Sequence, residues 1–144
     1  GVKVCVVKCG RHGSYVRTAD GTGIKALRAK GEDYPGEDWA GRELFEASFK
    51  VSKIVTATGA GDNAIAGFLA AFLKGRPLAE CLSTMTMCGA QNLSVQDAVS
   101  GIESWEDTQA RLQNQREKNA VQLEPDNWRE VEAGRLWAGP TDQS

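Results

Sequence analysis

The sequence predicts an α/β layered fold, present here in part as a few strands followed by packed helices. Three observations favour it. Runs of β-branched residues open the chain, a glycine turn at residues 59–61 leads directly into an apolar helix, and further helical stretches follow. No more than three or four strands are expected. The chain also starts at Gly1 within a strand-like run, which indicates a fragment of a longer domain.

The first strands are separated by glycine turns. Residues 2–8 are rich in β-branched side chains and predict a largely buried strand. Gly10 and Gly13 then mark a turn into a second strand at 14–18. The sequence at 19–23 is typical of a hairpin turn, so we expect the chain to return as another strand.

The next segment is less regular. Residues 24–29 predict a third short strand, and the polar stretch 30–42 predicts an extended loop or insertion. Trp39 in this loop is interpreted either as a packing element or as part of a partner surface. Residues 43–48 predict a helical turn, and residues 49–55 alternate well enough to predict a strand.

The first helix follows the glycine turn. Its apolar side chains recur at i, i+3, i+4, i+7 and i+8 and define one face. The intervening positions are alanine and glycine, so we expect the helix to be packed on both sides. The residues of the apolar face are Ile65, Phe68, Leu69, Phe72 and Leu73.

Two more helices and a tail complete the chain. Gly75 ends the first helix, and Pro77 is placed to begin the second. Ser104 forms a capping-box pattern with Asp107 for a third helix over 105–119, and the tail predicts a short docked helix. The second helix carries an apolar stripe of Leu78, Cys81, Leu82 and Met85.

Composition narrows the functional class. The 144 residues are 41% apolar and 25% charged, with a net charge of -2, which is typical of one globular domain. There is no basic excess to bind phosphate backbones, so nucleic acid is not an expected partner. The longest apolar stretch, residues 64–73, is too short to cross a bilayer, and no signal-peptide pattern opens the chain. We therefore expect a cytoplasmic protein without a membrane partner.

The four cysteines match neither a disulfide nor a zinc pattern. Cys5 and Cys9 would lie about 13 Å apart on one strand, which is beyond disulfide reach. Cys81 and Cys88 would lie about 10 Å apart on a helix, again too far. Neither pair has C-x-x-C spacing, and the chain has one histidine. We expect reduced core thiols and no metal site.

The stretch "TATGAGDNAIAGFL" at residues 56–69 carries the most specific functional signal. Backbone N–H groups at a helix start lack intrahelical partners, and the helix dipole adds positive charge there. Gly59 and Gly61 let the backbone approach a ligand closely, and Thr58 adds a hydroxyl donor. These features predict an anion site, most naturally for phosphate.

Asp62 directly follows this turn and has two interpretations. A carboxylate beside a bound phosphate is unfavourable unless it acts, for example by deprotonating a hydroxyl that attacks the phosphorus. Alternatively, it is a first-turn acid that stabilises the helix dipole by about 0.3–1 kcal/mol. The spacing matches neither the Walker A pattern nor the dinucleotide glycine pattern.

The motif "ATGAGDNAIAGFLAAF" resembles the C-terminal signature of the ribokinase-like (PfkB) family of carbohydrate kinases. The stretch "VVKCGRHGSYV" is similar to the family's strand-turn pattern V-K-x-G-x-x-G, and "CGAQNLSVQDAVSGI" to its late adenine-side helix and loop. The resemblance covers roughly residues 1 to 118. It implies a nucleotide-binding and catalytic C-terminal half over 1–122, with 123–144 as a C-terminal extension.

The resemblance implies phosphoryl transfer from Mg-ATP to the hydroxyl of a sugar or sugar-like substrate. Asp62 would be the catalytic base. The remaining roles divide among an anion hole, the nucleotide phosphates and ribose, and the adenine pocket. The anion hole would be formed by Thr58 and the amides of Gly59, Ala60 and Gly61, the phosphate and ribose contacts by Lys8, Gly10 and Gly13, and the adenine contacts by Asn92 and Val95.

Two substitutions depart from the family pattern. Thr56 replaces the first acid of the motif, which in many relatives helps to hold a monovalent cation, so dependence on such a cation is left open. Ala64 replaces an aromatic residue that follows the base. Asp62, the residue that carries the chemistry, is retained.

The family's sugar-binding residues and lid belong to an N-terminal half that this sequence lacks. The resemblance therefore implies that the isolated chain cannot phosphorylate a sugar and that apolar surface is exposed where the other half packs. Relatives often dimerise through the lid, so a homodimer of the full-length protein is left open. The alternative is a catalytically silent nucleotide-binding or interaction module of the same fold.

Overall fold

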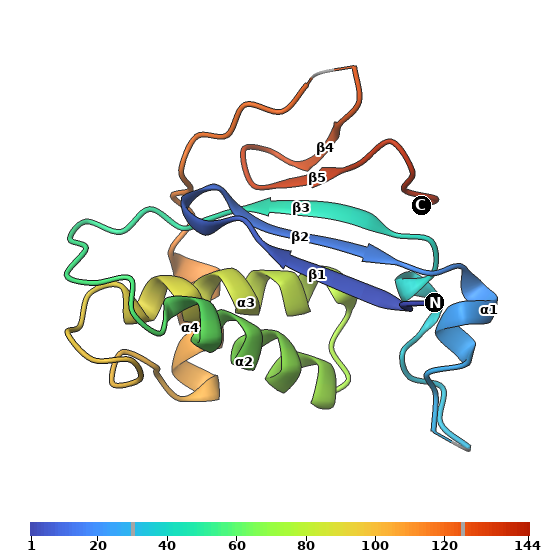
Figure 1. Cartoon of the computed structure of the whole chain (residues 1–144), viewed down its shortest axis with the longest axis horizontal. Helices are drawn as coiled ribbons and strands as arrows, with labels where there is room; N and C mark the ends of the chain where they lie inside the picture. Colours follow the sequence, from blue (N-terminus) through green and yellow to red (C-terminus); the bar gives the residue numbers. More distant parts are fainter. Residues whose placement is uncertain (30, 125) are drawn as a thin grey trace.

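The computed structural model describes residues 1–29, 31–124 and 126–144. An antiparallel sheet with strand order β1-β2-β3-β5-β4 packs on α2 and α3, which lie side by side against one face (Figure 1). The sheet is thus a single layer, with helices on the face that carries the main core. Its strands are β1 (Val4–Lys8), β2 (Gly13–Thr18), β3 (Glu43–Ala47), β4 (Arg129–Glu132) and β5 (Leu136–Ala138).

The first two strands are confirmed, with one correction. β1 pairs with β2 in an antiparallel hairpin that joins Val6 to Val16. The prediction that β1 is largely buried is wrong, because β1 is an edge strand of the described sheet and Cys5, Val7 and Lys8 are exposed. The turn between the strands forms a short 3-10 helix, Gly10–His12.

The predicted strand at 24–29 is wrong. A short helix, α1 (Gly21–Lys25), begins here because the Asp20 side chain accepts a hydrogen bond from the Gly23 amide at 2.8 Å. An N-cap of this kind favours a helical turn over a hairpin turn. The helix buries Ile24, the first residue of the predicted strand.

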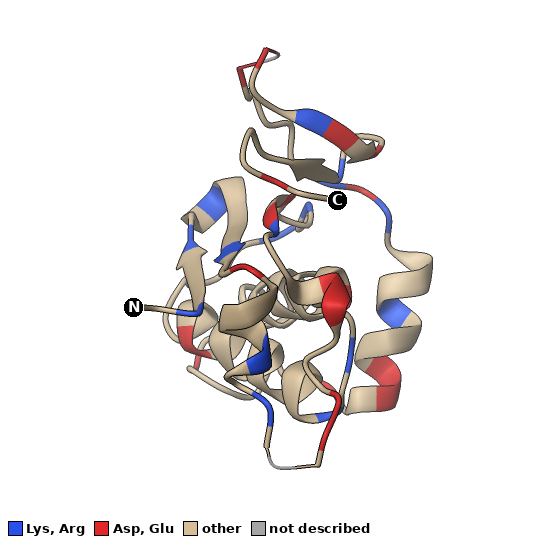
Figure 2. Cartoon of the chain, turned by 90° about the vertical axis from the view of Figure 1, so that its right-hand side faces the viewer, with Lys and Arg blue, Asp and Glu red and all other residues tan. Residues whose placement is uncertain are grey.

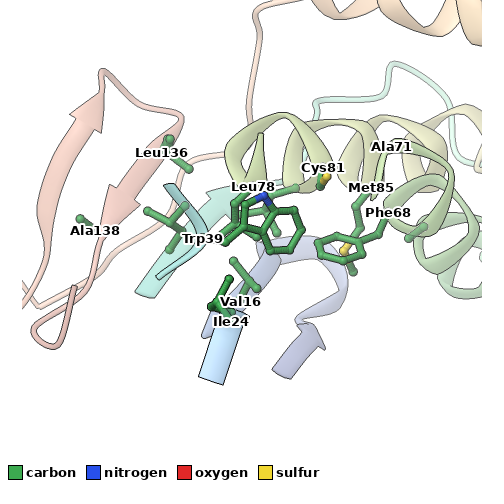
Figure 3. Packing of buried hydrophobic residues seen from close by; sticks show 13 residues of the cluster. Val16, Ile24, Trp39, Phe68, Ala71, Leu78, Cys81, Met85, Leu136 and Ala138 are labelled. Atoms are coloured by element: carbon green, nitrogen blue, oxygen red, sulfur yellow. The ribbon is translucent and has the colours of Figure 1, made fainter. Parts of the chain in front are cut away.

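The loop at 30–42 folds onto the core, although Lys30 lies outside the described residues. It contains a 3-10 turn, Glu37–Trp39, and Trp39 is fully buried. The Trp39 indole lies among core side chains (Figure 3) and makes edge-to-face contacts with Phe68 and Phe72, at 6.2 and 5.3 Å between ring centroids. The packing interpretation of Trp39 is confirmed, and a partner surface is excluded.

The strand predicted at 49–55 occurs earlier in the chain. Residues 43–47 form β3 rather than a helical turn, and 49–55 do not form a strand. Phe49 makes only an isolated bridge to Lys118 and buries its ring with Met87 and Ala90. The alternation at 49–55 therefore reflects one anchored aromatic residue rather than pairing along a sheet.

The first long helix, α2 (Ala60–Leu73), is confirmed, but its buried face differs from the prediction. α2 packs on α3 through small residues, because a Cβ on Gly67 would lie 2.7 Å from Cys88 Sγ. Leu69 and Leu73 of the predicted apolar face are exposed, so the helix is packed on one side only. The buried residues of α2 are Asn63, Ala64, Gly67, Phe68 and Ala71.

The second and third helices begin where the sequence predicts. Pro77 is the N-cap of α3 (Leu78–Asn92), and all four residues of its apolar stripe are buried. Ser104 accepts a hydrogen bond from the Asp107 amide at 3.1 Å and caps α4 (Trp105–Asn114). α4 ends five residues earlier than predicted, because Gln115 becomes extended and the chain turns inward.

The predicted tail helix is wrong. The tail instead forms the β4–β5 hairpin, and β5 pairs with β3. Trp128 lies edge-to-face over Tyr15 and Phe45 at 6.3 and 6.1 Å, on the sheet face opposite α2 and α3. Pro125 of this extension lies outside the described residues. The tail therefore completes the sheet edge that β3 would otherwise expose.

All four cysteines are free. Cys81 and Cys88 are core residues, and burial raises their pKa values to about 12 and about 11. Cys5 is exposed and Cys9 half-buried just beyond β1, so the core interpretation is wrong for these two.

The surface carries both signs of charge. In Figure 2, both basic and acidic residues occur on α4 and on the terminal hairpin. Within residues 1–29, 31–124 and 126–144, no helix combines the length and apolarity that crossing a bilayer requires.

Two carboxylates tie the end of the chain to β3. Burial alone would raise the pKa of Glu43, but Thr141 donates to Glu43 Oε2 through its amide and hydroxyl at 2.7 and 2.6 Å, and these hydrogen bonds hold the pKa below its usual value. Hydrogen bonds from Arg42 and from the Glu43 amide, both at 2.8 Å, likewise outweigh burial and lower the pKa of Asp142 from its usual value.

We expect acid to destabilise the protein through these two groups. Both carboxylates have lower pKa values in the folded state, so their stabilising contribution is complete above the unfolded values and is lost as pH falls through the folded values. Urea unfolding between pH 7 and pH 3 should show falling stability below about pH 4.5, with a shallower fall for Glu43→Gln. An identical pH profile for the variant would contradict this assignment.

Candidate functional site

The glycine turn before α2 is built so that only glycine fits at its first position. Gly59 is the N-cap of α2 and has φ +77°, and a Cβ there would lie 2.3 Å from the Ala98 carbonyl oxygen. The Asn63 side-chain amide donates to that same oxygen at 2.6 Å. The turn is therefore held against the 97–101 loop at close range.

Asn92 forms hydrogen bonds with the other side of the turn. Its side-chain amide donates to the carbonyl oxygens of Thr58 at 2.9 Å and Asp97 at 3.1 Å, and its own Oδ1 accepts from the Gly101 amide at 3.3 Å. Asn92 is fully buried. The Asn92 side chain thus joins the glycine turn to the 97–101 loop through both its amide nitrogen and its oxygen.

The first amides of α2 divide between the turn and solvent. The Ala60 amide donates to the Ala57 carbonyl at 3.3 Å, and the Asn63 amide donates to that of Gly59 at 2.9 Å. The amides of Gly61 and Asp62 have no acceptor among the described residues. These two N–H groups are the unpaired donors that a helix start offers to an anion.

Thr56 and Thr58 form a small hydroxyl pair beside the turn. The Thr58 amide donates to Thr56 Oγ1 at 3.1 Å, and the Thr56 hydroxyl donates to Thr58 Oγ1 at 3.0 Å. The hydrogen of the Thr58 hydroxyl remains free to donate. Thr56, which departs from the family pattern, therefore serves as a cap of the turn.

Lys8 and Asp62 meet at the mouth of the turn. Lys8 Nζ lies 4.0 Å from Asp62 Oδ1, and their side chains are 44% and 94% exposed. A Cβ on Gly61 would lie 2.8 Å from the same ammonium, so Lys8 extends over the bare backbone of Gly61. An exposed pair of this kind contributes little to stability, which leaves both groups available to a ligand.

A cavity of about 360 Å³ opens from this point between the β1–β2 turn, α2, α3 and the 48–54 segment. Its walls are mostly apolar, with Lys8 and Arg11 as its charged residues. Such a size and lining are typical of a small-molecule site. The wall includes Gly10, Gly13, Ser48, Phe49, Val51, Ile54, Ala60, Gly61, Met85, Leu93 and Asn119.

The structure brings most of the sequence-predicted residues to this region. Lys8, Gly10, Gly13, Ala60 and Gly61 line the cavity, although they come from two distant segments. Thr58, Gly59 and Asp62 form the turn at its edge. Asn92 and Val95, the predicted adenine contacts, do not line it; Asn92 is bonded behind the turn, and Val95 lies in the loop that follows α3.

Sequence reasoning missed Phe49, Ser48 and Asn119 on the cavity wall. Phe49 carried a signal that was interpreted as strand alternation. Asn119 lies in a polar run that predicted a solvated helix, and nothing in that run marks an inward side chain. Among the described residues, no three His, Cys, Asp or Glu side chains gather closely enough to hold a metal ion.

Comparisons with known proteins bear on the family and the fold of this chain. The family model described as pfkB family carbohydrate kinase matches residues 1–105. The crystal structure of Methanocaldococcus jannaschii nucleoside kinase, an archaeal member of the ribokinase family, is similar with a TM-score of 0.60 and 22% identity, over 78% of this chain and 30% of that one.

A second similar structure is that of Burkholderia thailandensis nucleoside kinase in complex with inosine. Its TM-score is 0.57 and its identity 17%, over 79% of this chain and 31% of the kinase. This chain therefore spans less than a third of either kinase's length. A search of curated proteins finds no match.

Proposed function

Because the chain belongs to the pfkB family of carbohydrate kinases, we propose that it supplies the ATP site and the catalytic base for phosphoryl transfer to a hydroxyl of a sugar or sugar-like substrate. The observation that supports this most directly is the placement of Lys8 Nζ over Gly61 and beside Asp62. A cation, two unpaired amides and a carboxylate meet at the mouth of one cavity.

The phosphate groups of ATP would lie against the glycine turn. Lys8 and the amides of Gly61 and Asp62 would balance their negative charge, since the ammonium lies at this turn and the two amides have no acceptor among the described residues. The apolar wall around Phe49 and Leu93 would receive the base, with Asn119 as a polar contact. The bare backbone of Gly61 fits a phosphate because any side chain would displace Lys8.

Magnesium would enter with the nucleotide, held by its phosphates as is usual for this ion. The described residues offer no cluster of carboxylates for an independent metal site. When bound, Mg2+ neutralises phosphate charge. The chain's own contribution is to position the phosphates and to keep Asp62 within reach of the acceptor.

Asp62 would act as general base. Its side chain is 94% exposed, so an acceptor hydroxyl can approach it directly. The carboxylate takes the hydroxyl proton while the acceptor oxygen bonds to the γ-phosphorus and the bond from that phosphorus to the bridging oxygen of ADP breaks. Lys8 and the helix-start amides stabilise the charge that spreads over the transferring group.

The acceptor would be selected by a further half of the protein. Leu69 and Leu73 on α2, together with Val2 and Ile54, are exposed, and β1 presents an unpaired edge within the described sheet. We infer that an N-terminal half packs there and completes the site, so the isolated chain does not phosphorylate a sugar. The similar kinases include one bound to inosine, and a nucleoside also presents a sugar hydroxyl.

Calorimetric titration of the chain with Mg-ATP tests the nucleotide site. We expect saturable binding that weakens at least about tenfold in Gly61→Val, because the side chain displaces Lys8 and covers the unpaired amides. Gly21→Val is the matched control, since Gly21 also starts a helix and its nearest neighbour would be 3.9 Å away. Equal binding by both variants would contradict the assignment.

If the parent chain does not bind Mg-ATP, the titration is repeated on the complete domain, meaning this chain joined to the proposed N-terminal half. Binding there, with transfer to one member of a sugar and nucleoside panel, would support the kinase. Binding without transfer to any acceptor would instead support the catalytically silent module.

A further inference from the structure

A buried charge network joins the end of the chain to the nucleotide cavity. Glu46 on β3 is fully buried, and its Oε1 accepts hydrogen bonds from Lys118 Nζ at 2.8 Å and from Arg135 Nε at 3.2 Å. Its Oε2 accepts from the Ser83 hydroxyl at 2.8 Å. One carboxylate therefore holds two cations, both supplied by residues beyond the part of the chain that the family model matches.

Lys118 is the member of this network that contacts the cavity wall. Its side chain is 3% exposed, and Nζ lies 3.2 Å from the centroid of the Phe49 ring. The same ammonium donates to the Ala47 carbonyl at 2.9 Å. A buried ammonium between a carboxylate and an aromatic face is held by both, which restricts the ring to one position.

The backbone around Lys118 pairs with the wall itself. The Asn119 amide donates to the Ser48 carbonyl at 2.9 Å, and the Lys50 amide donates to the Glu117 carbonyl at 3.0 Å. The Asn119 side chain adds a bond to Ser48 Oγ at 2.8 Å. Within the described residues, the Ser48 amide also donates to the His12 carbonyl at 3.3 Å, whereas Phe49 and Lys50 pair with the 117–119 segment through this bridge. The position of Phe49 and Lys50 therefore depends on that segment.

We propose that Lys118 is a positioning residue that holds the Phe49 wall and thereby sets the affinity of the cavity for nucleotide. The inference rests on the proposed function for the identity of the ligand. The position of the wall does not depend on that identity. Arg135 shares the same carboxylate without contacting Phe49, and it bonds instead to Ser83 and Glu132.

Three variants separate positioning from general stability. Lys118→Met removes the ammonium and keeps the aliphatic stem, while Arg135 still neutralises Glu46. Arg135→Met disturbs the same buried carboxylate but leaves the Lys118 ammonium over the Phe49 ring. Lys50→Met is the matched control, because Lys50 lies in the same bridge but forms an exposed ion pair with Glu117 at 3.7 Å.

Hydrogen exchange measures the wall without any ligand. We expect the Lys50 and Asn119 amides of the full chain to exchange at least about tenfold faster in Lys118→Met and to be unchanged in the other two variants. Titration with Mg-ATP should then show affinity reduced about tenfold in Lys118→Met alone, even where Arg135→Met lowers the melting temperature equally.

Unchanged hydrogen exchange in Lys118→Met would overturn the proposal. The proposal would also be overturned if Lys118→Met and Arg135→Met lowered the melting temperature equally and lost nucleotide affinity equally. A parent chain and complete domain that both fail to bind Mg-ATP would overturn the nucleotide part of it together with the proposed function. Faster exchange confined to Lys118→Met would in that case still support Lys118 as the residue that positions the wall.

Discussion

Replacing Asp62 by asparagine in the complete domain is expected to lower kcat by roughly 100- to 10,000-fold, the range of general base catalysis. The asparagine side chain cannot accept the hydroxyl proton, although its shape is nearly the same as that of aspartate. Nucleotide affinity should remain within about twofold, because the contacts to phosphate come from Lys8 and the helix-start amides. Steady-state kinetics together with direct titration measure both quantities.

Glu80→Gln is the matched control for the structural interpretation of Asp62. Glu80 lies in the first turn of α3 and pairs with Arg76 at 2.6 Å, far from the glycine turn in sequence and outside the cavity lining. A first-turn acid that only stabilises the helix dipole contributes about 0.3–1 kcal/mol in either helix. Near-normal turnover of Asp62→Asn, with a stability loss like that of Glu80→Gln, would reject the catalytic role.

Gly59→Ala is expected to destabilise the chain by more than about 3 kcal/mol. The substitution places a methyl group 2.3 Å from the Ala98 carbonyl oxygen at a residue with φ +77°. Backbone on both sides is held by Asn63 and Asn92, so the clash cannot be relieved by rotating one side chain. Loss of the turn should abolish nucleotide binding as well.

Gly75→Ala separates the clash from the backbone strain. Gly75 has φ +69°, and a Cβ there would meet nothing within 4 Å, so this variant carries only the left-handed penalty of about 1–2 kcal/mol. Urea unfolding of both variants gives the difference directly. Equal destabilisation by Gly59→Ala and Gly75→Ala would mean that the 97–101 loop moves aside at no cost. That result would contradict the hydrogen bonds that hold the loop in place.

The glycine turn was predictable because its signals are local. Gly59 and Gly61, followed by Asp62, predict the start of a helix at which an anion could bind. In the structure α2 begins at this turn. The cap at Ser104 and the apolar stripe of α3 are equally local, since each depends on residues three or four positions apart. These features were correct in position as well as in type.

The errors arise where a residue's neighbour is distant in sequence. Residues 24–29 were predicted as a strand, but the Asp20 side chain caps a helix there. Leu69 was predicted to lie on a buried face of α2, but it is exposed because no described residue covers it. The site shows the same division. The turn was predicted, whereas Phe49 and Asn119 reached the cavity wall through a bridge between segments about seventy residues apart.

The sequence by itself determined where α2, α3 and α4 begin and the glycine turn with its acid, because short-range hydrogen bonds and side-chain spacing specify them. Only the tertiary structure decided that the tail pairs with β3 and that Lys118 turns inward to Glu46. The physical reason is that an unpaired strand edge and a buried carboxylate each require a partner, and neither requirement says from where along the chain that partner comes.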